Sequence, residues 1–132
     1  MKNRKRLLLI ALMTAAAVSA FAQQYDPKSD FTVTKLDNDK SIEIIEYIGS
    51  KQTVNIPPII QGLPVTSIGG MAFSNCTNLT NVMFQGTIAS DKFNTFVPFP
   101  GDLRNKFYAT DKDKGTPGTY TRASGSNTWT KQ

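Results

Sequence analysis

A short strand-like pattern occurs twice in the chain, and this repetition constrains the fold more than any other feature. Val54 and Ile56 alternate with polar residues, and Val82 and Phe84 repeat that alternation 28 residues later. Alternation with a period of two is typical of strands that bury one face. A period of about 20 to 30 residues is typical of repeat proteins whose coils bury their apolar faces only by stacking. We therefore expect successive coils packed on one another.

The segment between the two strands predicts the other half of such a coil. Apolar residues recur at spacings of one, three and three, at Ala72, Phe73, Cys76 and Leu79. This spacing predicts a short helical turn with one apolar face. Each coil would then consist of a strand, a turn and a short helix.

Residues 56–84 read IPPIIQGLPVTSIGGMAFSNCTNLTNVMF. This segment resembles the BspA-type leucine-rich repeat, whose pattern runs Ile-Pro, Gly-x-Pro-Val-Thr-x-Ile-Gly and Ala-Phe-x-x-Cys-x-x-Leu-Thr-x-Val. The resemblance covers about residues 42–84, a third of the chain. It implies a leucine-rich-repeat solenoid, and an exported bacterial surface or periplasmic protein whose relatives mediate adhesion and protein–protein contacts.

Solenoids usually need about three repeats, and the chain has one full coil and the first strand of the next. The rest must therefore cap a truncated solenoid. Residues 31–47 predict a β-hairpin that resembles the N-terminal cap of the family. Residues 86–99 predict a degenerate third coil that carries Phe93, Phe96 and Phe99. The expected fold class is mainly β with short helical turns.

The last part of the chain predicts a short helix followed by a second β-hairpin. Asp102 would be the N-cap of the helix, and its apolar residues, including Phe107, would face inward. The hairpin is predicted from alternation around Tyr120 and Trp129 on either side of a Gly/Ser-rich turn. We expect 23–30 to be an unpaired polar leader, 31–98 the capped repeat domain and 99–132 a closing segment.

The first 22 residues predict a secretory signal peptide. Four of the 15 basic residues lie in the first six positions, an apolar run follows, and Ala20-Phe21-Ala22 is a suitable cleavage site. The apolar run is shorter than the ~20 residues that span a bilayer. Cleavage would leave 11 basic and 10 acidic residues, so the net charge falls from +5 to +1. Nucleic acid is therefore not an expected partner.

The composition excludes most catalytic centres that small enzymes use. The chain has no His and one Cys, which removes Ser-His-Asp and Cys-His nucleophiles, imidazole metal sites and paired-cysteine sites. Cys76 is expected to be a core residue, because no histidine can deprotonate it and its neighbours are not cationic. We expect a protein that is not an enzyme and holds neither a cofactor nor a metal.

The sequence leaves binding as the expected function, with three interpretations. A polar face of the stacked strands would contact a protein partner such as a host matrix or envelope protein, through Thr53, Asn55, Asn81, Met83 and Gln85. Tyr120 and Trp129 could instead form an aromatic platform of a carbohydrate- or cell-wall-binding module. The third interpretation is a structural remnant without a ligand. The sequence does not separate periplasmic, surface and secreted locations, and it does not indicate an oligomeric state.

Overall fold

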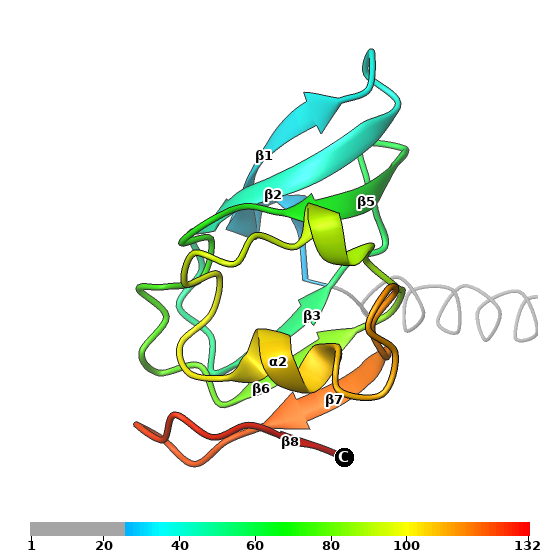
Figure 1. Ribbon diagram of the computed structural model, residues 1–132. Coiled ribbons are helices and arrows are strands. Elements are labelled where there is room, and N and C mark those ends of the chain that lie inside the picture. Colours follow the sequence, from blue (N-terminus) through cyan, green and yellow to red (C-terminus); the bar gives the residue numbers. More distant parts are fainter. Residues whose placement is uncertain (1–25) are drawn as a thin grey trace, which may run out of the picture.

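The computed structural model describes residues 26–132, so the predicted signal peptide at 1–22 and the first residues of the leader lie outside the described residues. The described chain is mainly β, in two four-stranded sheets with the orders β1-β2-β5-β4 and β3-β6-β7-β8 (Figure 1). The strands are β1 (Phe31–Leu36), β2 (Ser41–Tyr47), β3 (Thr53–Ile56), β4 (Ile59–Ile60), β5 (Leu63–Ile68), β6 (Asn81–Phe84), β7 (Gly118–Thr121) and β8 (Thr130–Lys131). The helical elements are the 3₁₀ turns η1 (Lys28–Asp30) and η2 (Ser90–Lys92) and the short helix α2 (Leu103–Phe107).

The first sheet contains the predicted N-terminal hairpin. β1 and β2 pair antiparallel, from Phe31 opposite Tyr47 to Leu36 opposite Ser41. β2 then pairs parallel with β5, which places Ile44 opposite Ile68. Two successive passes of the chain therefore lie side by side on this side of the molecule, with the hairpin strand β1 at the outer edge.

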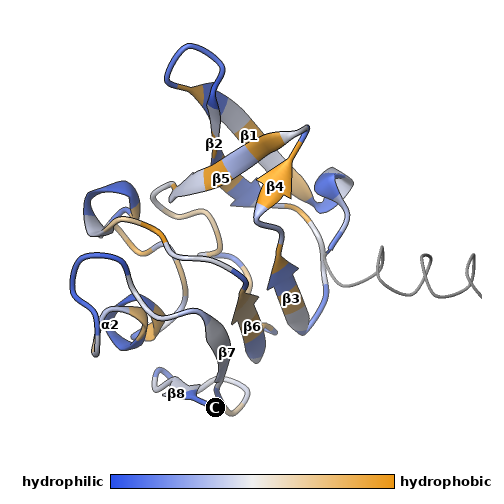
Figure 2. Cartoon of the chain, turned by 90° about the vertical axis from the view of Figure 1, so that its right-hand side faces the viewer, coloured by the Kyte–Doolittle hydropathy of each residue, from blue (hydrophilic) through white to orange (hydrophobic). Residues whose placement is uncertain are grey.

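The second sheet contains the strand pattern that occurs twice in the sequence. β3 and β6 are parallel and fully in register, from Thr53 opposite Asn81 to Ile56 opposite Phe84. Figure 2 shows the two strands side by side, each with both hydrophilic and hydrophobic residues. β7 pairs antiparallel with β6, and β8 pairs antiparallel with β7, as the predicted C-terminal hairpin requires.

Backbone hydrogen bonds also join the loops of successive passes. The N–H of Tyr47 donates to the carbonyl of Ala72 at 2.8 Å, and the N–H of Met71 donates to the carbonyl of Phe96 at 2.9 Å. In each case the two residues are 25 positions apart in the chain. Successive passes are thus linked by strand pairing in both sheets and by backbone hydrogen bonds outside the strands.

The predicted helical turn at 72–79 is instead a series of tight turns. The N–H of Cys76 donates to the carbonyl of Phe73, and the N–H of Leu79 donates to the carbonyl of Cys76, each at 3.1 Å. The N–H of Phe73 itself donates to Pro98 of the next pass at 2.8 Å. Because a backbone N–H of this segment bonds to the next pass, the segment does not form a continuous series of helical hydrogen bonds. The predicted apolar face is nevertheless present, since Phe73 and Leu79 are fully buried.

The core is rich in aromatic rings from all parts of the described chain. Phe73 stacks on Tyr47 on one side and on Phe99 on the other, with ring centroids 5.6 Å and 4.2 Å apart. Of the three phenylalanines in the predicted third coil, Phe93 and Phe99 are buried, whereas Phe96 is 64% exposed.

The closing segment is attached to the core through Asp102. Leu103 and Phe107 of α2 are buried as expected, and Asp102 lies at the predicted N-cap position, but its side chain makes no capping hydrogen bond. Its Oδ1 accepts a hydrogen bond from the backbone N–H of Trp129 at 2.8 Å. The Trp129 ring N–H donates to the carbonyl of Pro100 at 2.7 Å. Asp102 therefore holds the C-terminal hairpin rather than the helix terminus.

The expectation of an unpaired leader is wrong at Asp26. Its backbone N–H donates to the carbonyl of Asn55 at 3.2 Å, and its Oδ2 accepts the N–H of Asn55 at 3.1 Å. Lys51 lies 3.3 Å from Asp26 and 3.5 Å from Asp30. The leader thus covers the edge of β3 that β6 does not occupy.

Among residues 26–132, no helix has the length and apolar character needed to cross a bilayer.

Candidate functional site

The structure brings together the residues predicted to form a polar strand face. Thr53 lies opposite Asn81, and Asn55 lies opposite Met83, on the parallel strands β3 and β6. Val54 and Val82, between them in sequence, are fully buried. Because side chains alternate between the two sides of a strand, the four predicted residues lie on the side away from the core.

Gln85, the fifth predicted residue, lies just beyond the end of β6. Its side-chain N–H donates to the Met83 sulfur at 2.8 Å. This contact connects Gln85 to the same face and orients the thioether. Gln85 is exposed, whereas Asn55, Asn81 and Met83 are half-buried.

The polar face extends onto two further strands that the sequence interpretation did not include. Thr119 and Thr121 of β7 lie opposite Met83 and Asn81, and Thr130 of β8 lies opposite Thr121. We call the complete set the strand face: Thr53, Asn55, Asn81, Met83, Gln85, Thr119, Thr121 and Thr130. None of its side chains is charged. The alternation around Tyr120 indicated which threonines face outward, but it did not indicate that β7 pairs with β6.

The proposed aromatic platform is wrong for this structure. Tyr120 and Trp129 are both fully buried, so neither ring presents a face on which a sugar could stack. The Tyr120 hydroxyl donates to the carbonyl of Thr116 at 2.6 Å. The Arg122 guanidinium lies 5.2 Å from the centroid of the Trp129 ring. Both aromatic residues therefore act as core of the closing segment.

Cys76 packs against the core, as its position in the repeat predicts. Its side chain is partly buried, and burial, with a smaller contribution from the charge of Glu46, raises the pKa of the thiol. The thiolate, which is the nucleophilic form, is therefore disfavoured near neutral pH. Within residues 26–132, no group of three or more potential metal-ligating acidic or sulfur side chains gathers at one point.

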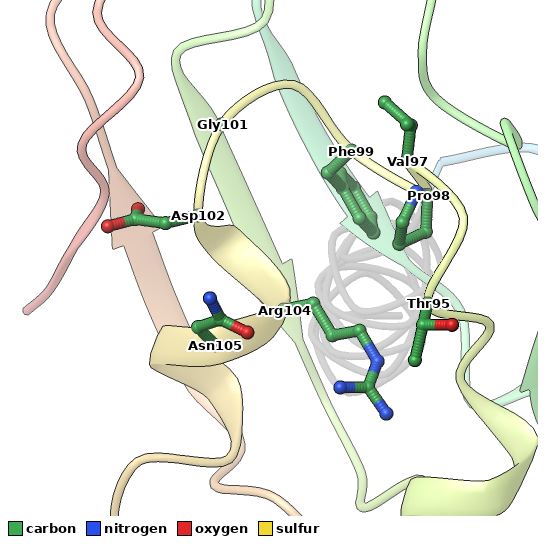
Figure 3. Close-up of a pocket in the computed structure, with 8 residues that line it drawn as sticks. All are labelled: Thr95, Val97, Pro98, Phe99, Gly101, Asp102, Arg104 and Asn105. Carbon is green, nitrogen blue, oxygen red and sulfur yellow. The ribbon is translucent and has the colours of Figure 1, made fainter.

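A pocket beside Arg104 is a second candidate site, and it lacks any sequence motif. It has a volume of about 300 Å³ and lies between residues 95–99 and the start of α2 (Figure 3). Val97, Pro98 and Phe99 line the pocket on its apolar side, where only Val97 is exposed, and Arg104 lies across from them.

Fixed contacts hold the Arg104 side chain in this pocket. Its Nε donates to the carbonyl of Phe93 at 2.9 Å, and its Nη2 donates to the carbonyl of Ser90 at 3.0 Å. The guanidinium also lies 4.9 Å from the centroid of the Tyr108 ring. Burial raises the pKa of Tyr108 to about 12, although the charge of Arg104 opposes this shift. Tyr108 therefore stays neutral, and its hydroxyl donates to the carbonyl of Ile88 at 2.7 Å.

No protein-family model matches the chain, and no curated protein matches it. Among solved structures, a crystal structure of a T. pallidum leucine-rich repeat protein is similar, with 31% sequence identity and a TM-score of 0.43. The match covers 44% of this chain and 27% of that protein, so this chain corresponds to about a quarter of its length.

Proposed function

We propose that this chain is an exported, non-enzymatic leucine-rich-repeat protein of the BspA type that makes protein–protein contacts through the strand face. In this proposal the two sheets are a short solenoid, with β1 as one cap and the C-terminal hairpin as the other. The support is the repeat motif at 56–84, the parallel pairing of strands 28 residues apart, and backbone hydrogen bonds between residues 25 positions apart.

The observation that carries the binding proposal is the register of β3 and β6. It places Thr53 beside Asn81 and Asn55 beside Met83, and β7 and β8 add threonines to the same face. The backbone of each strand is held by its neighbours, so these side chains are presented on a rigid support. Recognition would then depend on hydrogen bonds and shape, since the face has no charge with which to attract a partner over a distance.

Four strands also give the face more area than the two strands expected from sequence. A standard interface buries about 800 Å² on each partner. The leader at Asp26 closes one side of the face, and the C-terminal strand β8 forms the other. We propose a host matrix or envelope protein as the partner, in accordance with the signal peptide expected at 1–22.

A binding assay with matched variants tests this function. Residues 23–132 would be immobilised and titrated with candidate matrix and envelope proteins, and the dissociation constant would be measured. Asn81→Lys places a charge at the centre of the face, and Thr32→Lys places the same charge on the exposed position of β1. We expect Asn81→Lys to weaken the affinity by at least about tenfold and Thr32→Lys to leave it unchanged.

Two results would contradict the proposal. Equal affinities for the two lysine variants would show that the strand face is not the contact surface. Failure to find any saturable partner would favour a structural remnant without a ligand. Cell fractionation with surface proteolysis would test export separately, and it would distinguish periplasmic from surface-exposed protein.

A further inference from the structure

The pocket beside Arg104 combines a fixed cation with an apolar wall, and this combination goes beyond the proposed strand-face function. We propose that the pocket binds a carboxylate carried on an apolar residue, as at the C-terminus of a partner peptide. The carboxylate would lie on the Arg104 guanidinium, and the apolar side chain would lie against Val97, which lines the pocket and is exposed. Binding is non-covalent and needs no cofactor.

The two partly or fully buried arginines of the described chain differ in a way that indicates a ligand. Arg122 is buried, and its Nε, Nη1 and Nη2 all donate to backbone carbonyls within the protein. Arg104 uses only Nε and Nη2 in this way. Its Nη1 makes no hydrogen bond to residues 26–132, and the Arg104 side chain lines the pocket. The fold therefore fixes the position of Arg104 but leaves some of its hydrogen-bond donors without a protein acceptor among the described residues.

Arg104 forms no ion pair with an acidic group of the described residues, although the charge of Asp91 reaches Tyr108 beside it. No carboxylate of residues 26–132 lies within 4.0 Å of its guanidinium. Asp102 also borders the pocket, but Figure 3 shows its side chain pointing away from Arg104, and its Oδ1 is bonded to Trp129. A half-buried guanidinium with free N–H donors favours a carboxylate, because charge-assisted hydrogen bonds are the strong ones.

Apolar groups surround the pocket and continue beyond it. Phe96 is 64% exposed, Val97 is 51% exposed and Met71 is 52% exposed. Phe96 and Met71 are adjacent, since the N–H of Met71 donates to the carbonyl of Phe96. Val97 has a φ of 44°, a conformation that is costly for a β-branched residue. Strain of this kind is often retained at binding sites.

These features together select the occupant. A free inorganic anion would use Arg104 but not the apolar wall, and a neutral apolar side chain would use the wall but not Arg104. A terminal carboxylate next to an apolar side chain uses both, and the residues before it would lie along Phe96 and Met71. The pocket volume of about 300 Å³ accommodates one such residue.

The test titrates residues 23–132 with acetyl-Ala-Ala-Leu, followed by amide chemical shifts in NMR. Two matched ligands separate the sources of the carboxylate: the same peptide with a C-terminal amide, and acetyl-leucine. We expect saturable shifts at residues 95–105 with the free acid and at least about a tenfold weaker affinity for the amide. Acetyl-leucine would bind more weakly than the peptide, because it lacks the residues that contact Phe96.

Variants of the protein complete the test. Arg104→Gln should weaken the binding of the free-acid peptide by at least about tenfold and leave the weak binding of the amide unchanged. Arg104→Lys should restore part of the lost affinity. Thr95→Trp, at an exposed loop position, should block the pocket without removing Arg104 from its carbonyl partners. Lys112→Gln is the control, because Lys112 is exposed, does not line the pocket and forms no ion pair with the described residues.

Three results would overturn the proposal. The first is equal affinity for the acid and the amide, and the second is no saturable shift at 95–105 up to about 10 mM peptide. The third is unchanged binding in Thr95→Trp, which remains informative even if Arg104→Gln fails to fold. None of these results bears on the strand face, so the two proposals are tested independently.

Discussion

Phe73 and Phe99 stack almost face to face, with ring centroids 4.2 Å apart and an angle of 9° between their planes. The residues are 26 positions apart and come from successive passes of the chain. Phe73 N–H also donates to the carbonyl of Pro98, next to Phe99. The same two passes are therefore joined through both side chain and backbone.

We expect Phe73 and Phe99 to be energetically coupled. Phe73→Leu and Phe99→Leu should each destabilise the protein, and a double-mutant cycle by urea unfolding should give a coupling free energy of about 1 kcal/mol. Phe73→Leu combined with Tyr108→Phe is the control pair, because the structure records no contact between these rings, and the two effects should add. Additivity for the Phe73 and Phe99 variants would contradict the role of the stack.

Arg122 is expected to be essential for the attachment of the C-terminal hairpin. Its guanidinium donates to the carbonyls of Leu79, Ser126 and Thr77 at 2.7, 2.8 and 3.0 Å. Arg122→Met would leave these carbonyls unpaired and should cost about 3 kcal/mol. Arg122→Lys keeps the charge but not the three-way geometry, so an intermediate loss is expected. Amide exchange should increase first at 118–131, and unchanged exchange there would refute the assignment.

Substitutions at Gly115 and Gly125 distinguish the cost of an unfavourable backbone angle from the cost of a steric overlap. Both have a positive φ, of 75° and 77°, which is unfavourable for other residues. A Cβ at Gly115 would overlap the buried ring of Phe107, whereas a Cβ at Gly125 meets nothing within 4 Å. Gly125→Ala should cost about 1 kcal/mol, and Gly115→Ala about 3 kcal/mol or more, measured by chemical unfolding. Similar losses would show that the loop at 115 moves away from Phe107.

Alkaline pH should destabilise the protein through Tyr108. Burial raises its pKa in the folded state to about 12, whereas an unfolded tyrosine titrates near about 10. The unfolded chain therefore loses the proton first, and stability is constant below pH ~10 and falls between pH ~10 and ~12. Tyr47 and Tyr120 also have a raised pKa because of burial, so they act in the same direction.

Tyr108→Phe isolates the contribution of this one hydroxyl. At pH 7 the variant should lose about 1 kcal/mol, since the hydrogen bond to the carbonyl of Ile88 is removed. Above pH ~10 its stability should fall less steeply than that of the parent protein. Thermal unfolding at intervals from pH 7 to 11.5 would measure both effects, and parallel pH profiles would contradict the prediction.

The features that could be predicted from sequence are those with local, periodic patterns. Val54 and Val82 share the same alternation, and their strands pair in register as that pattern indicated. The hairpin of β1 and β2 was recognisable because turn-forming residues separate two alternating runs. The outward face at Thr53 and Asn81 followed directly from the same alternation.

The features that could not be predicted depend on contacts between distant segments. Asp102 has the sequence context of a helix N-cap, yet its carboxylate accepts a hydrogen bond from the backbone N–H of Trp129. A rule based on neighbouring residues cannot predict a partner 27 positions away. The local sequence does not indicate a partner for Asp26, because the residue that bonds to it, Asn55, is 29 positions away. Arg104 had no motif, since its pocket is made by a loop and a helix that become neighbours only in the folded chain.

The closing strand β7 determines how this architecture can change in length. It runs antiparallel to β6 and occupies the edge on which another parallel strand would have to be added. Asp26 occupies the corresponding edge of β3. An additional coil can therefore be added only as an internal insertion, between Ile56 and Gly118, that keeps both terminal segments. The same protected edges hinder strand-to-strand polymerisation of separate molecules, because neither side of this sheet offers a long row of unpaired backbone groups.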